Sequence, residues 1–520
     1  MGRRVDRDLE TELKFEIDAA GAKALTKHFE LASLGKARKL RSVYYDTPET
    51  ELRDSGMILR VRDDGKERVQ TVKQSVLGGS GVHRGEWEIV LPSGSGQALS
   101  PDLDAAAKTP VSEILNRREL GFVRPAFEVE IKRIVRSIES GGAIIEVALD
   151  QGCARVEDRR APISELELEL KTGSLRALFD LARDCLAIAP LELSFISKSE
   201  RGYALLEDGE TAATPAVNPP LEPSASAGEA FQGIAGAALA QIIANARVLA
   251  ETRLTEAVHQ LRVGVRRLRS ALSLFGPMLT GAESALIKAE LEWLAGALDA
   301  ARDLDVFNTT VFQPAMDRDP ELAGLLAFGA RLAAARHEAY DIAQAAVTSP
   351  RFRALALNTL AWIEAGDWHG SDDPVRAGLR DRPALALAAE EFEHRRRKIV
   401  RKGRHLAEME PAERHKLRIR VKRLRYACGF FASLYAGRSA KAHKGFSRAA
   451  RNLQERLGDL TDIAFSRDLA QRVAGLKDGS DPRAAFAAGA LVGQASAPTA
   501  TRIKAAVKAH RALEDADAFW

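Results

Sequence analysis

Charged and apolar residues alternate near the start of the chain, in the segment Asp8-Leu-Glu-Thr-Glu-Leu-Lys-Phe-Glu-Ile-Asp18. In an extended strand, alternate side chains lie on the same face. Glu10, Glu12, Lys14 and Glu16 therefore share one face, and the intervening apolar residues point into a core. The charged face of a single strand is usually solvated, but the same pattern returns in several later segments, which indicates a chemical role.

Carboxylates and cations are segregated among these segments. Acidic pairs lie at Glu10 and Glu12 and again at Glu165 and Glu167, whereas basic residues dominate at Arg60 and Arg62, Lys73 and Arg84. Hard cations such as Mg²⁺ or Mn²⁺ take carboxylate and phosphate oxygens, while Arg and Lys hold the remaining phosphate charge. Carboxylates opposite guanidinium and ammonium groups therefore suit a polyphosphate bridged by a divalent metal ion.

Antiparallel strands must position these residues. One solvated sheet face explains any single segment, whereas a closed barrel explains all of them, because interior and exterior positions alternate along every strand of a barrel. We therefore predict a β tunnel with a charged interior, covered by helices at 19–32, 111–120 and 174–188. The segments with strand periodicity are 8–18, 57–62, 67–74, 83–91, 126–138, 143–150 and 162–171.

The charged segments form an ordered series of motifs. In chain order they are Glu10-x-Glu12-x-Lys14, Tyr44-Tyr45-Asp46-Thr47-Pro48, Leu59-Arg60-Val61-Arg62, Thr71-Val72-Lys73, Arg84-x-Glu86-x-Glu88, Arg133, Leu149-Asp150-x-Gly152, Glu165-x-Glu167-x-Glu169-Leu170-Lys171 and Ser197-Lys198-Ser199-Glu200-Arg201-Gly202. Over residues 6–207 this order resembles the CYTH superfamily, the triphosphate tunnel metalloenzymes. The resemblance implies an eight-stranded antiparallel tunnel that hydrolyses or rearranges triphosphate-bearing substrates with Mg²⁺ or Mn²⁺.

The resemblance also implies a role for individual residues. Lys14 and Glu88 would orient the attacking water, and Glu146 and Glu169 share the inward parity as supporting groups. The residues implied as metal ligands are Glu10, Glu12, Asp150, Glu165 and Glu167. The residues implied to hold the triphosphate are Arg60, Arg62, Lys73, Arg84, Arg133 and Lys198.

The composition is that of an ordinary soluble protein. The chain has 520 residues, 46% hydrophobic and 28% charged, with a formal net charge of +4, so its bulk charge predicts no partner. A Pro/Ser/Ala-rich stretch divides it, and we expect an α+β domain at 1–207, a linker at 208–227 and an all-α domain at 228–520. Without a signal-peptide core or an apolar run of membrane-spanning length, we expect a cytoplasmic location.

One motif occurs twice in the second half, with the spacing His-x-x-Arg-x-x-x-basic-Arg-Leu-Arg. A helix turns by about 100° per residue, so the His and the basic residues three, seven and ten positions after it fall within an arc of about 80° on one helix face. Two related halves of a helical bundle, packed face to face, would bring both stripes to a common surface. The stripes consist of His259, Arg262, Arg266 and Arg269 in the first copy, and of His415, Arg418, Lys422 and Arg425 in the second.

Two stripes of like charge cost free energy unless an anion neutralises them. Nucleic acid is not expected, because aromatic residues make up only 6% of the chain and none interleaves either stripe to stack bases. Residues 228–515 resemble CHAD, the conserved-histidine α-helical module, which implies recognition of inorganic polyphosphate through a basic groove. Lys422 stands where the first copy has Arg266, which keeps the charge but weakens bidentate binding.

Together these features predict an inorganic triphosphatase, a phosphoanhydride hydrolase that converts inorganic triphosphate or short polyphosphate to pyrophosphate and phosphate with Mg²⁺ or Mn²⁺. The helical domain is expected to bind long-chain polyphosphate and to associate the enzyme with polyphosphate granules. Two alternatives stay open. The tunnel acts on a nucleoside or thiamine triphosphate, or as an adenylate cyclase, or the protein is a non-catalytic polyphosphate-granule scaffold. No membrane partner is expected.

Overall fold

The computed structural model describes residues 7–31, 37–74, 82–92, 99–115, 123–207, 212–322, 324–370, 373–437, 439–475, 482–496 and 499–520. The chain divides into two compact units. Unit 1 consists of Met1–Ala212 and Pro350–Gly366, and unit 2 of Ala213–Ser349 and Asp367–Trp520. Each unit is described here by itself.

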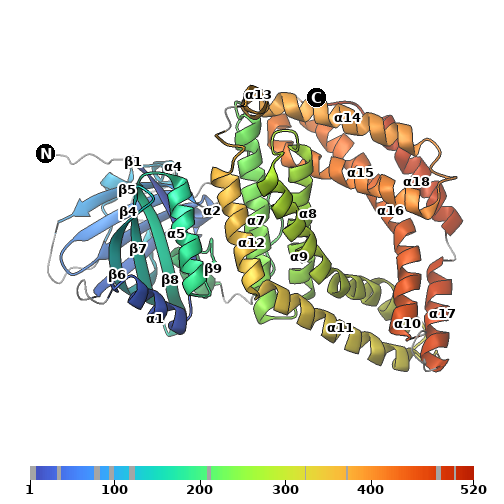
Figure 1. Cartoon of the computed structure of the whole chain (residues 1–520), viewed down its shortest axis with the longest axis horizontal. Coiled ribbons are helices and arrows are strands. Elements are labelled where there is room, and N and C mark those ends of the chain that lie inside the picture. Colours follow the sequence, from blue (N-terminus) through green and yellow to red (C-terminus); the bar gives the residue numbers. More distant parts are fainter. Residues whose placement is uncertain are drawn as a thin grey trace. The chain divides into compact units, whose positions relative to one another are not determined.

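The strands of unit 1 form one antiparallel sheet that closes on itself (Figure 1). The order is β5-β4-β3-β2-β6-β7-β8-β1-β9, and an additional β5–β1 pairing joins the two ends of the eight longer strands into a barrel. The strands are β1 (Arg7–Glu16), β2 (Arg38–Asp46), β3 (Met57–Asp63), β4 (Arg68–Gln74), β5 (His83–Leu91), β6 (Arg124–Ser140), β7 (Ala143–Val156), β8 (Arg159–Thr172) and β9 (Glu192–Leu193).

The predicted eight-stranded antiparallel tunnel is thus confirmed, although β2 was not among the segments with strand periodicity. Five successive residues of β2, Ser42–Asp46, are buried, so the strand has no polar–apolar alternation at its end. Val43 and Tyr45 point to the outer core, while Ser42 and Tyr44 line the inside of the barrel. The period-2 signal fails where both faces of a strand are covered.

Helices and loops cover the apolar outer positions of the barrel. Val43 of β2 and Leu59 and Val61 of β3 pack against Leu99 and Ala106, from the segment that includes α3 and α4. On another side, α5 and α6 pack on β6, β7 and β8. The helices of unit 1 are α1 (Ala19–His28), α2 (Glu51–Asp54), α3 (Leu103–Ala106), α4 (Ser112–Leu115), α5 (Leu175–Ile188), α6 (Lys198–Leu206) and α12 (Pro350–Ala365).

Helix α12 belongs to unit 1 although it lies in the second half of the sequence. It packs against α5 and β9. Arg183 Nε of α5 donates a hydrogen bond to Asn358 Oδ1 of α12 at 2.9 Å. An ion pair joins Arg353 of α12 to Glu192 of β9 at 3.7 Å. The tunnel unit is therefore completed by a helix far along the chain.

The named elements in the described part of unit 2 are all helices, and they repeat one arrangement. In the first half α8 packs between α7 and α9, and in the second α15 packs between α14 and α16. Helices α8 and α15 carry the duplicated motif and pack against each other, which confirms the predicted all-α region of two related halves. The helices are α7 (Ala227–Glu251), α8 (Thr255–Leu274), α9 (Ala282–Phe307), α10 (Gln313–Arg318), α11 (Leu325–Val347), α13 (Pro374–Asp381), α14 (Ala384–Gly403), α15 (Pro411–Phe430), α16 (Ala440–Val473), α17 (Pro482–Ser496) and α18 (Thr499–Glu514).

The proline-rich segment before α7 is tied to unit 2. Arg267 of α8 is 4% exposed, and it donates to Asn218 Oδ1 at 2.9 Å and to the Val217 carbonyl at 2.6 Å. The backbone N–H of Leu221 donates to Ser433 Oγ at 2.8 Å. Most of this segment therefore lies along the helices and does not swing freely.

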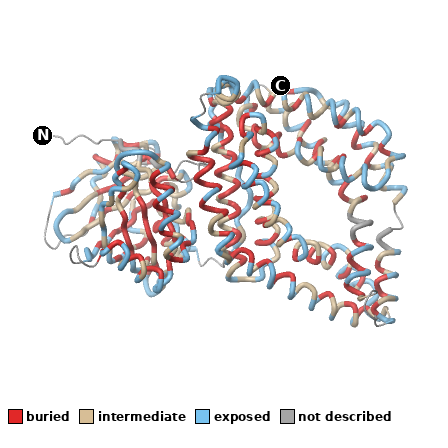
Figure 2. The backbone as a smooth tube through the Cα atoms, viewed as in Figure 1, coloured by how far each residue is buried: buried red, intermediate tan, exposed pale blue. Residues whose placement is uncertain are grey.

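Helix α7 has the length and composition of a membrane span, contrary to the expectation that no apolar run reaches this length. Its most apolar window is 61% buried inside the protein, as in the core helix of a helical bundle. Figure 2 shows that most of α7 is buried. The apolar character of α7 is accounted for by packing among its neighbours.

Gly202 allows α6 to lie close to the barrel. A methyl group added there would overlap the ring of Phe127, which is 3% exposed and stacks on Tyr44. We predict that Gly202→Ala destabilises unit 1 by about 1–3 kcal/mol, the usual cost of overpacking, and lowers the melting temperature followed by circular dichroism. Ala204→Ser on the exposed side of α6 is the control. Equal melting temperatures for the two variants would contradict this packing.

Candidate functional site

The inside of the barrel encloses a cavity of about 610 Å³. Its wall is strongly charged, and both signs are present. The acidic side chains that line it are Glu10, Glu12, Asp64, Glu86, Glu88, Glu146, Glu167 and Glu169. The basic ones are Lys14, Arg38, Arg60, Arg62, Lys73, Arg133, Lys171 and Lys198.

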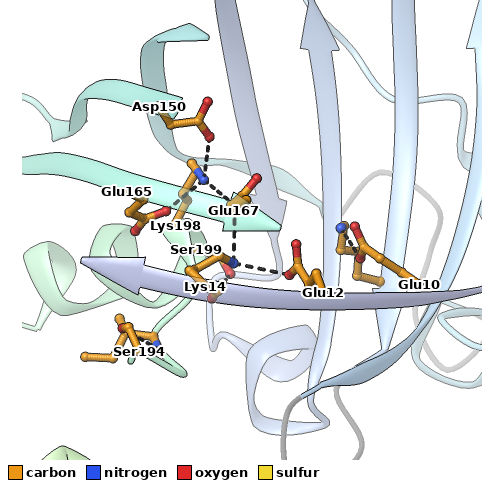
Figure 3. A network of polar contacts seen from close by, with 12 residues as sticks. Glu10, Glu12, Lys14, Asp150, Glu165, Glu167, Ser194, Lys198 and Ser199 are labelled. Carbon is orange, nitrogen blue, oxygen red and sulfur yellow. Dashed lines mark hydrogen bonds and ion pairs between the residues drawn. The ribbon is translucent and has the colours of Figure 1, made fainter. Parts of the chain in front are cut away.

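Lys198 is the centre of one charge network (Figure 3). Its Nζ atom lies 2.8 Å from Asp150 Oδ2, 2.8 Å from Glu165 Oε2 and 2.6 Å from Glu167 Oε1. Lys198 is the first residue of α6, whose start is fixed by a capping box in which Ser197 and Glu200 satisfy each other's backbone N–H groups. The cap therefore sets the position of the ammonium group.

Arg133 joins the same network from β6, the strand that pairs with β7 at Asp150. Its Nε and Nη2 atoms donate to the two oxygens of Asp150 at 2.7 and 2.5 Å, and Nη2 also donates to Glu167. Arg201 of α6 donates from Nε to Glu165 at 3.1 Å. Asp150 and Glu165 are fully buried and do not line the cavity. In this geometry both carboxylates contact the cations of the wall from behind, and their assignment as metal ligands stays a prediction.

Glu167 stands between three cations. Burial alone would raise its pKa, but Lys198, Arg133 and Lys14 together hold the pKa well below its usual value. Lys14 Nζ lies 3.4 Å from Glu167 and 3.3 Å from Glu12. Glu167 is therefore held in its ionised form by the cations around it.

A second cluster in the lumen has an excess of carboxylates. Lys73 Nζ lies 2.6 Å from Glu10 and 3.1 Å from Glu86. Burial raises the pKa of Glu10, and the charges of Glu12 and Glu86 raise it further against the opposing effect of Lys73. Burial likewise raises the pKa of Glu169, in spite of its 2.6 Å contact with Lys171.

These carboxylates offer the oxygen donors that a hard divalent ion prefers. The raised pKa of Glu10 and of Glu169 indicates that the nearby lysines do not fully offset burial and the repulsion between carboxylates. A bound divalent ion would add positive charge and so stabilise the ionised carboxylates. The donor set therefore fits such an ion. In the arrangement described, however, no three Asp, Glu, His or Cys side chains among the residues placed are already grouped as a metal centre.

A third cluster in the lumen consists of arginines. The positive charge of Arg60, followed by burial and by Arg133, lowers the pKa of Arg62. Arg60 Nη2 donates to Thr71 Oγ1 at 3.0 Å, while its Nε atom is buried and has no hydrogen-bond partner among the described residues. Burial lowers the pKa of Arg60, but the charges of Tyr44, Glu86 and Glu88 raise it overall. The two guanidinium groups offer donors of the kind that bind phosphate oxygens.

The two residues implied to orient water have separate neighbours. Lys14 lies beside Glu12 and Glu167, whereas Glu88 lies 3.9 Å from Arg60 and 3.7 Å from Arg62. Both line the cavity. The side chain of Arg84, implied to hold the triphosphate, lies outside the described residues, although its backbone pairs with β1.

Several residues of the wall were missed as direct contributors. Glu86 and Lys171 lie within the motifs and have the inward parity, which was a usable signal. Arg38 belongs to the unrecognised strand β2. Arg201 comes from a helix, so strand alternation could not identify it.

In unit 2, the packing of α8 against α15 brings the two basic stripes together. The half-buried Lys422 of α15 is affected most, after burial, by the charges of Arg266, Arg418, Arg425 and Arg262, which lower its pKa to about 7. The described groups that act most strongly on Lys422 are thus all cations. We call Arg262, Arg266, Arg418, Lys422 and Arg425 the cationic cluster.

His259 and Arg302 extend the cationic cluster. Burial and the charges of Arg302, Arg266 and Arg262 lower the pKa of His259. His259 Nδ1 and Arg266 Nε are buried without a hydrogen-bond partner among the described residues. Arg302 of α9 was missed because it lies outside the duplicated motif. Its pKa is lowered by burial and by Arg266.

The other two predicted stripe residues lie further out. Arg269 is exposed and 4.0 Å from Glu292, and its charge acts on Arg423. His415 is exposed near the start of α15. Within the described part of the chain, no principal influence on the pKa of Lys422 or His259 comes from either residue. The structure therefore brings together Arg262 and Arg266 of the first stripe with Arg418, Lys422 and Arg425 of the second.

Fold and site together define a class of protein: a closed antiparallel tunnel with a charged lumen, joined to a duplicated helical bundle. The CYTH domain family profile matches residues 8–203, and the CHAD domain family profile matches residues 233–471. The chain therefore contains a CYTH domain followed by a CHAD domain, as the motif order predicted.

Individual proteins show the same likeness. An inorganic triphosphatase of Haemophilus influenzae is 30% identical over 167 residues, which span 32% of this chain and 46% of that protein. The crystal structure of a CHAD domain from the plant Ricinus communis is 31% identical and covers 58% of this chain and 97% of its own, with a TM-score of 0.49. PptA from Streptomyces chartreusis is 18% identical over 55% of this chain and 100% of its own, with a TM-score of 0.39.

The role of Asp150 behind the cavity wall can be tested. Asp150→Asn leaves Arg133 and Lys198 without one buried counter-charge, and we predict a loss of about 3–5 kcal/mol in the stability of unit 1. Thermal unfolding would report the loss, and Mn²⁺ titration by calorimetry should still detect binding at the carboxylates of the lumen. Glu139→Gln, at an exposed position of β6, is the matched control. Unchanged stability with loss of Mn²⁺ binding would instead make Asp150 a metal ligand.

Proposed function

We propose that the tunnel hydrolyses inorganic triphosphate, or short polyphosphate, to pyrophosphate and phosphate. The observation that carries this proposal is one closed lumen that holds an arginine cluster and a carboxylate-rich cluster together. A linear chain of phosphates requires cations along its length and a metal site at its oxygens. The partial likeness to a protein named inorganic triphosphatase supports the same substrate.

The arginines would bind and orient the phosphates. Arg60 and Arg62 carry mutually repelling charge that a phosphate would relieve, and Arg133 lies on the same wall. We assign the orientation of the attacking water to Lys14 or Glu88. The water oxygen bonds to the terminal phosphorus, the bridging P–O bond breaks with its electrons on pyrophosphate, and one proton passes to solvent.

The metal is proposed to be Mg²⁺ or Mn²⁺. Glu10 and Glu12 are the best placed of the ligands implied by the motifs, and Glu86, Glu146 and Glu169 line the same lumen. A bound divalent ion supplies charge neutralisation at phosphate oxygens and thereby favours the leaving pyrophosphate. Asp150 and Glu165 would contribute by holding Lys198 and Arg133 in place.

The helical unit is proposed to bind long-chain polyphosphate through the cationic cluster. Burial and the neighbouring arginines lower the pKa of Lys422 and of Arg302, and gathered cations of this kind gain free energy when a polyanion neutralises them. Binding there would raise the local concentration of substrate, or hold the enzyme on polyphosphate granules in the cytoplasm, without any new catalytic contact. No observation on the described chain favours nucleic acid or a membrane as the partner.

Two other functions remain to be distinguished by experiment. A nucleoside or thiamine triphosphate, or cyclisation of ATP, would use the same phosphate grip but requires a site for the organic group. A non-catalytic scaffold would bind polyphosphate without turnover. Phosphate release from inorganic triphosphate, ATP and long-chain polyphosphate, with Mg²⁺, Mn²⁺ or chelator, separates these cases.

Loss of one lumen carboxylate should abolish turnover. We predict that Glu12→Gln lowers kcat for triphosphate by about 100-fold or more, as for removal of a group that stabilises transition-state charge, while triphosphate still binds in calorimetry. Glu139→Gln, outside the lumen, should leave kcat unchanged. Normal turnover by Glu12→Gln would remove Glu12 from the proposed metal site.

The two domains should be separable by charge reversal. We predict that Arg262→Glu combined with Arg418→Glu abolishes binding of long-chain polyphosphate in a filter or calorimetric assay and leaves triphosphate hydrolysis intact. The reason is that each substitution replaces a cation of the cluster by an anion, at a like-charge cost to polyanion binding. An equal loss of hydrolysis would contradict the division of roles.

A further inference from the structure

The cationic cluster differs from an ordinary basic patch because one of its members can lose its charge near neutral pH. Four of its five side chains are guanidinium groups, which stay protonated in proteins. The fifth is the ammonium group of Lys422, at the position that holds Arg266 in the first copy of the motif. Among the four stripe positions, the two copies differ only here. Lys422 lies on α15, which packs against α8.

The surroundings of Lys422 disfavour its charged form. Its own helix α15 contributes Arg418 and Arg425, and α8 contributes Arg262 and Arg266. These four charges, after burial, are the largest influences, and each of them lowers the pKa of Lys422, which reaches about 7. An ammonium group that shares a half-buried space with four guanidinium groups releases its proton more readily than one in water.

The carboxylates on the neighbouring elements have other partners. On α9, Asp299 accepts from Arg262, and on α16, Asp459 lies 3.4 Å from Arg456. On α14, Glu391 lies 2.8 Å from Arg395. The amide oxygen of Gln454 on α16 accepts from Arg425 at 2.8 Å. None of these acids is among the principal influences on Lys422, so its repulsion by the arginines is not offset locally.

We propose that the cationic cluster binds polyphosphate together with a proton, which Lys422 takes up, so that affinity weakens as the pH rises above neutrality. This inference rests on the polyphosphate binding proposed above. In the free protein the Lys422 amine is largely neutral above its pKa, and a bound polyanion favours the ammonium form. The two equilibria are linked: protonation of Lys422 raises the affinity for the polyanion, and a bound polyanion raises the pKa of Lys422 by the same free energy.

Two other groups respond in the same direction at lower pH. Burial raises the pKa of Asp303 on α9 to about 6, and Arg262 is the strongest charge acting against this shift. Burial and the charge of Arg302 lower the pKa of His259, so its ring gains charge at a lower pH than an ordinary histidine does. Both changes make the surroundings of the cationic cluster more positive as the pH falls. The titration of Asp303 overlaps the acidic part of the range in which Lys422 titrates, and it changes the affinity for a polyanion in the same direction.

The direct test is the pH dependence of binding of long-chain inorganic polyphosphate to the full chain at constant ionic strength. Internal phosphates of a long chain hold no titratable proton in the neutral range, so the ligand charge stays constant. For one proton taken up by a group of pKa about 7, Kd should weaken about tenfold between about pH 6 and about pH 8. Calorimetry in two buffers of different ionisation enthalpy should show proton uptake near neutral pH.

Two substitutions of Lys422 and one control make the test specific. Lys422→Arg keeps a permanent charge, so we expect binding at high pH to become tighter and the dependence on pH to disappear above neutrality. Lys422→Met keeps the stem without the charge, and at neutral pH it should bind as weakly as the wild type does at high pH, without proton uptake near neutral pH. Lys416→Arg, exposed on the same helix, should behave as the wild type.

The outcomes separate this inference from the proposed function. Binding of polyphosphate by the wild type with no proton uptake, or the same dependence on pH in Lys422→Arg as in the wild type, would overturn the inference alone. Failure of the wild type to bind polyphosphate at every pH would overturn the proposed binding function, and the inference with it. Circular dichroism of each variant shows whether the helices are intact.

Discussion

Charge compensation inside a closed barrel is the constraint on which the tunnel depends. Closing the sheet removes its edges and turns every second side chain of each strand inward. A carboxylate or ammonium group left unpaired there would cost several kcal/mol. Glu167 meets this condition through Lys14 of β1, Arg133 of β6 and Lys198 of α6. Three separate elements must therefore assemble before one side chain is stable, so the charge order and the barrel closure depend on each other.

The two sites satisfy electrostatics in opposite ways. In the lumen, cations and carboxylates neutralise one another, as Lys73 does between Glu10 and Glu86. These ion pairs hold the side chains of the wall in place. A bound substrate and its metal ion would take over the contacts that the lysines and carboxylates now make with each other. The cationic cluster of unit 2 has one sign of charge, and together with burial its arginines lower the pKa of Lys422. Such a surface gains most from an external polyanion and least from its own neighbours.

Strand alternation predicted which side chains enter the lumen, because a period of two residues is fixed by backbone geometry. Strand alternation could not predict how deeply each side chain is buried. Asp150 and Glu165 have the parity of the lumen residues, yet α6 and Arg133 cover them completely. Helical periodicity placed Arg262 and Arg418 on stripes, but only the packing of α8 on α15 decides which residues of each stripe meet. The contribution of Arg302 depends on a third helix, outside the duplicated motif.

The route of the chain decides how the two units can be studied. Unit 1 includes α12, although the sequence of α12 resembles that of the helices of unit 2. Contacts of Arg183 and Arg353 hold α12 on the tunnel unit. The proline-rich segment that looks like a free linker is held on unit 2 by Arg267. A cut after the tunnel sequence would remove α12 and expose the faces of α5 and β9 that it covers. Loss of activity in such a fragment would report lost packing, so point substitutions in the full chain are the informative experiments.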